Sequence, residues 1–255
     1  MSVFNKYSFY YDLFYKNKDY QAEVDYVVAL IKKNNANAKS ILDLGSGTGQ
    51  HDFKFAKAGF DVHGVDLSSE MVELADKQFV LYPDLKDKVK FSVGDARSVE
   101  LNQKFDVVVS LFHVINYQIT NRDLQNFFST ANKHLDIGGL LIFDSWYGPA
   151  VLTNLPEVRA KEIDTETHKV LRVAQPEVYP NENSVDVNYK VLITDKQTKV
   201  TDEILETHKM RYLFKSEIEQ LFSDNNFELI CFEEWITGSI PGFDSWGVTF
   251  VGRKG

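Results

Sequence analysis

The sequence predicts an α/β fold with a mostly parallel sheet, followed by an antiparallel β insertion. Its first part alternates short, nearly continuous apolar strands with helical patterns, which is typical of a parallel sheet covered on both faces. After Pro149 the pattern changes to period-two alternation in runs such as SVDVNYKVLIT and ETHKMRYLF, which favours antiparallel strands. Two further apolar runs, at 227–236 and 246–255, predict a closing pair of strands.

Size and composition indicate one globular domain over residues 1–255. The chain is 44% hydrophobic and 25% charged, which excludes a disordered protein. Its net charge of −9 gives no electrostatic reason to bind a nucleic-acid backbone. Cys231 is the single cysteine, so no internal disulfide can form and a reducing compartment is expected. No apolar run resembles a secretory signal or a membrane span, so we expect a cytoplasmic protein with no nucleic-acid or membrane partner.

Within this domain we expect four parts. They are an N-terminal helical lid (1–35), a ligand-binding core (36–149), the antiparallel insertion (150–213), and a closing helix with a hairpin (214–255).

The individual elements follow in order along the chain. Helices are predicted at 20–33, 51–59, 69–79, 121–135 and 216–225, and core strands at 40–45, 61–66, 89–95, 105–112 and 140–146. Gly59 and the pair Gly138–Gly139 are expected to end the helices that precede them. Ser216 and Glu219 predict a capping box at the start of the last helix.

A glycine-rich loop follows the first core strand, in ILDLGSGTG (41–49). Open α/β sheets bind ligands at this edge. Dinucleotide sites use G-x-G-x-x-G, but here the glycines stand at 45, 47 and 49 and position 50 is Gln. Asp43 would also repel a pyrophosphate, whereas it suits a cationic ligand such as S-adenosylmethionine. A nicotinamide-dependent oxidoreductase stays open as a disfavoured alternative.

Two more acidic residues end the next strands, Asp66 in GVDLS and Asp95 in VGDAR. We expect Asp66 to accept both ribose hydroxyl protons, as a carboxylate at this position also does in NAD enzymes. We expect Asp95 to accept from the adenine amino group. Strand-end aspartates also cap helices and turns, but three in register with one glycine loop favour a ligand site.

The chain resembles the class I S-adenosylmethionine-dependent methyltransferases. DLGSGTG, GVDLS, GDAR and FDVVVSLF occur in the order of that family. It is also similar to the N,N-dimethyltransferases of nucleotide-linked amino sugars, in YDLFYKNKDYQAEVDYV, SLFHVINY and FDSWYGP. The resemblance implies a Rossmann-like, seven-stranded sheet, mostly parallel with an antiparallel last strand.

The acidic residues and the resemblance together indicate one cofactor site. The residues expected to bind S-adenosylmethionine are Tyr20, Asp43, Gly45, Ser46, Gly47, Gly49, Asp66, Leu67, Met71, Asp95, Ala96 and Leu111. The resemblance also places Tyr11 and Tyr117 in the active site, although some relatives carry His where this chain has Tyr117.

Histidines are the remaining candidates for catalysis. His113 follows the fourth strand at the same edge as the acidic residues, so it is either a base or orienting group or a hydrogen-bonded residue of the pocket wall. The other five are isolated in the sequence, and no metal is expected.

These observations predict methyl transfer to a small-molecule acceptor, foremost the amino group of a nucleotide-linked sugar. One alternative is O-methylation of another small metabolite or polysaccharide precursor, and another is a non-catalytic cofactor-binding protein. Residues 150–215 hold 10 basic and 11 acidic side chains, so this region is less acidic than the remainder. It either tolerates an anionic acceptor or forms a solvated sheet or the surface of a homodimer.

Overall fold

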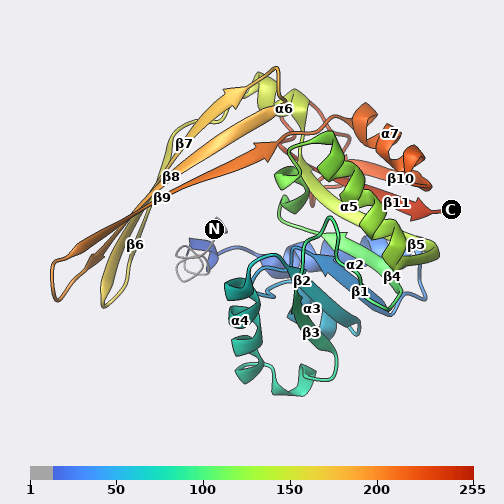
Figure 1. Ribbon diagram of the computed structural model, residues 1–255, viewed down its shortest axis with the longest axis horizontal. Coiled ribbons are helices and arrows are strands. Elements are labelled where there is room, and N and C mark those ends of the chain that lie inside the picture. Colours follow the sequence, from blue (N-terminus) through green and yellow to red (C-terminus); the bar gives the residue numbers. More distant parts are fainter. Residues whose placement is uncertain (1–13) are drawn as a thin grey trace.

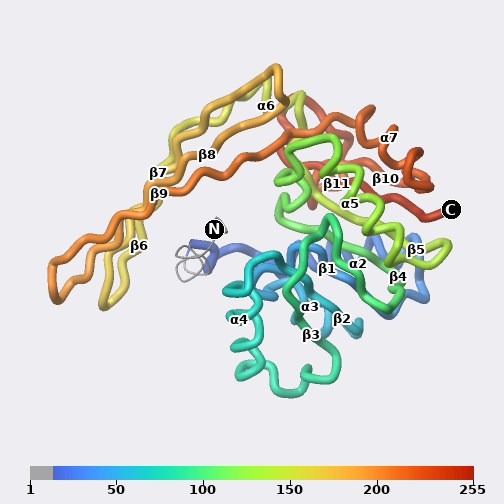
Figure 2. Tube along the Cα trace, viewed as in Figure 1, coloured from blue at the N-terminus to red at the C-terminus, as the bar shows by residue number. Residues whose placement is uncertain are grey.

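The computed structural model describes residues 14–255, which form a core and an arm that projects from it (Figures 1 and 2). The core strands are β1 (Ser40–Leu44), β2 (Asp61–Asp66), β3 (Val89–Val93), β4 (Phe105–Ser110), β5 (Leu135–Trp146), β10 (Phe227–Glu234) and β11 (Gly247–Lys254). The arm strands are β6 (Arg159–Asp164), β7 (His168–Tyr179), β8 (Ser184–Asp195) and β9 (Thr201–Arg211). The α-helices are α2 (Tyr20–Asn34), α3 (Asp52–Lys57), α4 (Ser69–Lys77), α5 (Asn121–His134), α6 (Gly148–Thr153) and α7 (Lys215–Asp224). Short 3-10 helices are η1 (Gln78–Val80), η2 (Pro83–Leu85) and η3 (Val114–Tyr117).

The core sheet has seven strands in the order β10-β11-β5-β4-β1-β2-β3. Neighbours from β3 to β5 pair in parallel, whereas β11 is antiparallel to both β5 and β10. The predicted class, a mostly parallel sheet with an antiparallel last strand, is confirmed. The carboxyl ends of β1, β2 and β4 therefore meet at one edge, where the glycine loop lies.

Helices cover both faces of this sheet. On one face, Phe128 of α5 and Phe222 of α7 pack against Phe143 of β5. On the other, Val27 of α2 and Phe55 of α3 belong to a second buried cluster. Strands with apolar side chains on both faces are what the near-continuous apolar runs predict. Among the described residues, no helix has the length and apolar character needed to span a membrane.

The arm is an antiparallel sheet in the order β6-β7-β8-β9, so the predicted antiparallel insertion is confirmed. One face buries Val170, Val191 and Ile193 together with Phe14. At its base, Tyr147 and Leu213 form a bridge that joins the arm to the end of β5. The arm thereby overhangs the edge of the core sheet that carries the glycine loop (Figure 1).

The fifth core strand starts earlier than the sequence predicts. β5 begins at Leu135, directly after α5, rather than at residue 140. Leu135 adopts extended backbone angles and pairs with Phe105, so the strand continues across Gly138 and Gly139. These glycines therefore do not end the helix, because the chain has already turned into the sheet.

The predicted capping box of the last helix is wrong. α7 starts at Lys215 with Phe214 at its N-cap position, and no side chain caps it. The Phe214 ring packs so closely on Gly148 that an added Cβ there would lie 2.6 Å from it. This packing sets the start of the helix one residue before Ser216.

Candidate active site

A cavity of about 500 Å³ opens at the carboxyl edge of the core sheet and reaches the arm. The predicted cofactor residues that line it are Tyr20, Gly45, Ser46, Gly47, Asp66, Leu67, Met71, Asp95, Ala96 and Leu111. The predicted catalytic residues His113 and Tyr117 line it as well. Asp43 and Gly49 do not, and Tyr11 lies outside the described residues.

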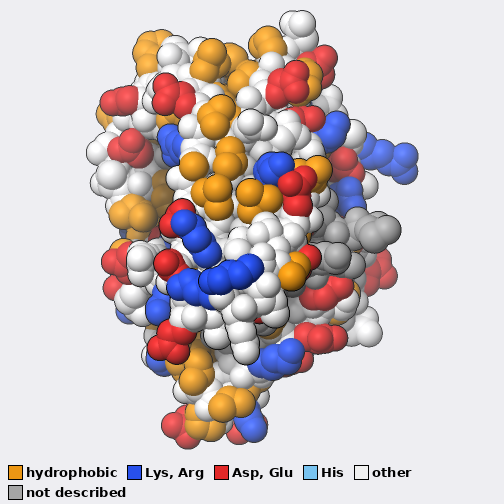
Figure 3. All heavy atoms as spheres, turned by 90° about the vertical axis from the view of Figure 1, so that its left-hand side faces the viewer, with side chains coloured by type: hydrophobic (Ala, Val, Ile, Leu, Met, Phe, Trp, Pro, Cys, Tyr) orange, Lys and Arg blue, Asp and Glu red, His pale blue; other side chains and the backbone are white. Residues whose placement is uncertain are grey.

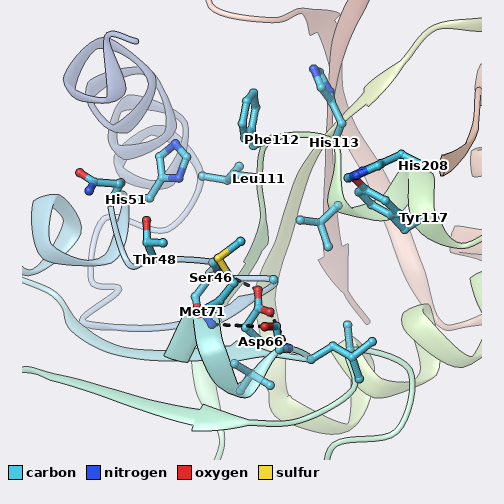
Figure 4. Close-up of a pocket in the computed structure, with 18 of the residues that line it drawn as sticks. Ser46, Thr48, His51, Asp66, Met71, Leu111, Phe112, His113, Tyr117 and His208 are labelled. Atoms are coloured by element: carbon cyan, nitrogen blue, oxygen red, sulfur yellow. Dashed lines mark hydrogen bonds between the residues drawn. The ribbon is translucent and has the colours of Figure 1, made fainter. Parts of the chain in front are cut away.

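The glycine loop and Asp66 form one hydrogen-bonded unit at the base of the cavity. The backbone N–H of Gly47 donates to Oδ2 of Asp66 over 2.8 Å, and that of Ser68 donates to Oδ1 over 2.9 Å (Figure 4). Gly47 has a φ of +55°, and a Cβ added to it would meet no atom within 4 Å. The loop backbone at Gly47 is therefore open to close approach by a ligand.

The third glycine of the loop has a different role. A Cβ added to Gly49 would lie 2.6 Å from Cζ of Phe91, and the residue has a φ of +77°. Gly49 is therefore required by packing between the loop and β3 rather than by contact with a ligand. Sequence spacing does not distinguish these two requirements, because both call for glycine.

Asp43 differs from expectation. Its side chain is buried beneath the loop beside that of Asp52, which is also fully buried. Burial, and then the neighbouring charge of Asp52, raise the pKa of Asp43 well above its usual value, and burial raises the pKa of Asp52 to about 7. The pair retains a proton near neutral pH. Asp43 therefore does not present a negative charge to the cavity, although the sequence had suggested that this charge would favour a cationic ligand.

The other two strand-end acids line the cavity but differ in their partners. Burial raises the pKa of Asp66, opposed by its two backbone hydrogen bonds. Asp95 is paired with Arg97, whose Nη2 lies 2.6 Å from Oδ2, and this hydrogen bonding lowers the pKa of the Asp95 carboxyl. Arg97 also reaches Asp123 in the first turn of α5 over 3.0 Å, which fixes the position of the loop after β3.

One end of the cavity is closed by a buried ionic cluster that sequence reasoning missed. Nε2 of His51 lies 2.8 Å from Oε2 of Glu23, and the Lys18 ammonium pairs with the same carboxylate. Burial alone would raise the pKa of the Glu23 carboxyl. Hydrogen bonds and charge from His51, and then from Lys18, outweigh burial and lower that pKa to about 2. The Tyr20 ring meets His51 edge to face at 5.0 Å. The signal for His51 was its place two residues after the last glycine of the loop.

His113 lies toward the other end of the cavity, away from Asp66 and Met71 (Figure 4). Its Nδ1 lies 2.7 Å from Oδ2 of Asp144, a buried residue of β5. Its backbone N–H also donates to that carboxylate over 3.2 Å. Phe112 and His113 both have a φ of +64°, a costly conformation for residues with a side chain. Asp144 thus holds both the ring and the strained backbone of His113, and such strain is common at functional sites.

Tyr117 is held by a residue of the arm. Its Oη lies 2.6 Å from Nδ1 of His208 in β9. The His208 ring is in edge-to-face contact with Tyr189 of β8, at 4.9 Å between ring centroids. All three side chains line the cavity. His208 was also missed, because no local pattern in a strand predicts which residue of the core it will meet.

Comparison with known proteins relates the chain to methyltransferases. Residues 41–139 match a family described as a methyltransferase domain. Over 215 residues the chain is 29% identical to dTDP-3-amino-3,4,6-trideoxy-alpha-D-glucopyranose N,N-dimethyltransferase of Streptomyces venezuelae, covering 84% of this chain and 86% of that protein. It is 31% identical to dTDP-4-amino-2,3,4,6-tetradeoxy-D-glucose N,N-dimethyltransferase of Saccharopolyspora spinosa, covering 52% of this chain and 51% of that protein.

Solved structures agree with this relation. The fold matches Streptomyces venezuelae DesVI with a TM-score of 0.78 and 27% identity, over 96% of this chain and 97% of that one. It also matches an S-adenosylmethionine-dependent methyltransferase from Clostridium acetobutylicum with a TM-score of 0.81 and 22% identity, over the full length of both chains. The likeness thus includes the arm as well as the core.

Proposed function

Since the chain is an S-adenosylmethionine-dependent methyltransferase, we propose that it methylates the amino group of a nucleotide-linked sugar. The observation that carries this proposal is its likeness, over 84% of its length, to an N,N-dimethyltransferase of a dTDP-linked amino sugar. That likeness extends well beyond the methyltransferase domain at 41–139.

In this proposal the cofactor occupies the part of the cavity that the glycine loop and Asp66 line. S-adenosylmethionine supplies a methyl group on a sulfonium, and its carbon–sulfur bond breaks as the acceptor bonds to the methyl carbon. In this proposal the methionine part lies along Gly47, Tyr20 closes the far end, Asp66 binds the ribose and Asp95 borders the adenine. The apolar residues Leu67, Met71, Ala96 and Leu111 complete the walls.

The protein must hold the acceptor in line with the methyl group and exclude water. Phe112, His113 and Tyr117 surround the space left for the acceptor in this proposal. An amine needs only its free-base form, whereas a hydroxyl needs a base to remove its proton. His113, fixed by Asp144, would orient the acceptor or accept its proton.

A direct assay tests the proposal. The purified protein is incubated with S-adenosylmethionine and a dTDP-linked 3-amino sugar, and the products are analysed by mass spectrometry. Mass increments of one and then two methyl groups are expected. The corresponding 3-hydroxy sugar nucleotide is the matched control, and methylation of that compound alone would support O-methylation and overturn the proposal.

We also propose that the enzyme is cytoplasmic, supplies polysaccharide biosynthesis and forms a homodimer.

The outer face of the arm supports the homodimer, because Leu171 pairs with Leu192 there and Leu205 is 69% exposed. Ion pairs between Lys169 and Glu162 and between Lys190 and Glu203 accompany these apolar residues, and Figure 3 shows apolar and charged side chains mixed on this side. Sedimentation equilibrium should give twice the chain mass, and Leu205→Glu should shift it toward the monomer.

A further inference from the structure

The arm supplies a histidine to the acceptor end of the cavity. His208 is only 5% exposed, and its Nδ1 lies 2.6 Å from Oη of Tyr117. The two residues are 91 positions apart in the sequence, one on η3 and one on β9. Figure 4 shows their side chains pointing toward each other, on the side of the cavity away from Asp66.

The other ring nitrogen of His208 faces a carboxylate. Nε2 lies 3.5 Å from Oε2 of Glu206, and both side chains are at most 10% exposed. A carboxylate beside Nε2 stabilises the tautomer that carries its proton there, and it also stabilises the imidazolium. In that tautomer Nδ1 accepts the hydrogen bond from the Tyr117 hydroxyl.

We propose that Tyr117, His208 and Glu206 form a relay that takes the proton from the acceptor's ammonium group before methyl transfer. This inference rests on the proposed amine acceptor. The ammonium proton moves to Oη of Tyr117 while the Tyr117 hydroxyl proton moves to Nδ1 of His208, leaving a neutral amine, a neutral phenol and an imidazolium paired with Glu206. The amine lone pair is then free to bond the methyl carbon.

The relay would remove a proton that prevents the acceptor amine from reacting. An α-amino group has a pKa of about 7.7–8.0, so a comparable sugar amine arrives mostly protonated near neutral pH and cannot act as a nucleophile. Tyr117, Tyr189 and Glu206 are three titratable groups that contact His208. Burial raises the pKa of Tyr189 to about 12, which leaves Glu206 as the one anionic neighbour among them.

The test uses His208→Asn, because the asparagine amide oxygen can still accept the Tyr117 hydrogen bond but cannot take its proton. General-base catalysis contributes about 10²–10⁴-fold, so kcat should fall by about 10²-fold or more near pH 7. The deficit should shrink as the pH is raised, because the amine then arrives as free base. Glu206→Gln should show the same pattern more weakly.

Two measurements separate the relay from a structural role. S-adenosylhomocysteine affinity, measured by calorimetry, should stay within about two-fold of the wild type, and His168→Asn, an arm histidine outside the cavity that pairs with Asp195, should change nothing. Acceptor binding to the S-adenosylhomocysteine complex is titrated by calorimetry in two buffers of different ionisation enthalpy. The number of protons exchanged with the buffer on binding should differ between His208→Asn and the wild type.

The outcomes are distinct. A wild type that methylates no dTDP-linked amino sugar refutes the proposed function, and the relay with it. An active wild type together with a fully active His208→Asn, or with a deficit that is the same at every pH, refutes the relay alone.

Discussion

Single residues of the glycine loop serve different purposes that the sequence motif does not separate. Gly47 faces open cavity, Gly49 packs on Phe91, and Asp43 lies buried beneath the loop. Asp66 binds the loop backbone through its side chain and also lines the cavity. The motif thus combines a backbone position that is open to the cavity with one that packing requires, and substitutions within it should separate the two.

Gly47→Ala should weaken S-adenosylhomocysteine binding by about 10-fold or more, because its Cβ would enter the cavity. A side chain in the left-handed region also costs about 1–2 kcal/mol of stability. Gly59→Ala is the matched control, since Gly59 has a φ of +106°, equal open space and no place in the cavity. Calorimetric titration should show weakened binding only in the first variant, and equal affinities would contradict the assignment.

The buried acid pair makes stability depend on pH. The folded pKa of Asp52 is raised to about 7, against about 3.9 in an unfolded chain. Its stabilising contribution is therefore complete below about pH 4 and lost as the pH rises to about 7. Urea denaturation gives the free energy of unfolding of the wild type and of Asp52→Asn. The value for the wild type minus that for the variant should fall between about pH 4 and about pH 7. Asp61→Asn, at an exposed position, should show no such trend.

His113→Gln should lower kcat while leaving S-adenosylhomocysteine affinity unchanged. The side chain is held by Asp144 at the acceptor end, away from Asp66 and Met71, so its loss affects the acceptor rather than the cofactor. Steady-state kinetics and calorimetric titration together check this, and an equal loss of both would count against the role.

Elements distant in the sequence complete the walls of the cavity. The segment before α2 contributes Tyr15, whose ring meets Phe112 edge to face at 5.0 Å. Lys18 does not line the cavity, but its ammonium lies 4.4 Å from the centre of the Phe112 ring. The arm contributes Tyr189 and His208. The cavity is thus enclosed by elements outside the methyltransferase domain.

Deleting residues 1–18 should weaken S-adenosylhomocysteine binding. Loss of Lys18 removes one partner of Glu23, which also pairs with His51 at the cavity wall. Deleting only residues 1–13 keeps Lys18 and is the matched comparison. Full-strength binding after the longer deletion would refute the predicted lid, and a thermal melt checks that each variant is folded.

The whole molecule should be stabilised by the ligand that fits its cavity. S-adenosylhomocysteine at 100 times its Kd should add about 2.7 kcal/mol, which is about 5–10 °C in Tm for a chain of this size. NAD⁺ at the same concentration should give no shift. A shift with NAD⁺ and none with S-adenosylhomocysteine would contradict the cofactor assignment and revive the oxidoreductase alternative.

The sequence alone was sufficient for the fold class, and most of the residues that it predicts to bind the cofactor line one cavity at the predicted edge of the sheet. These depend on patterns within a few residues: apolar strands, a glycine turn and an acid at a strand end. Tertiary structure alone decided that burial, and then the neighbouring Asp52, raise the pKa of Asp43, that Asp144 holds His113 and that His208 meets Tyr117. Those facts depend on burial and on contacts between residues far apart in the chain, and local patterns carry no information about either.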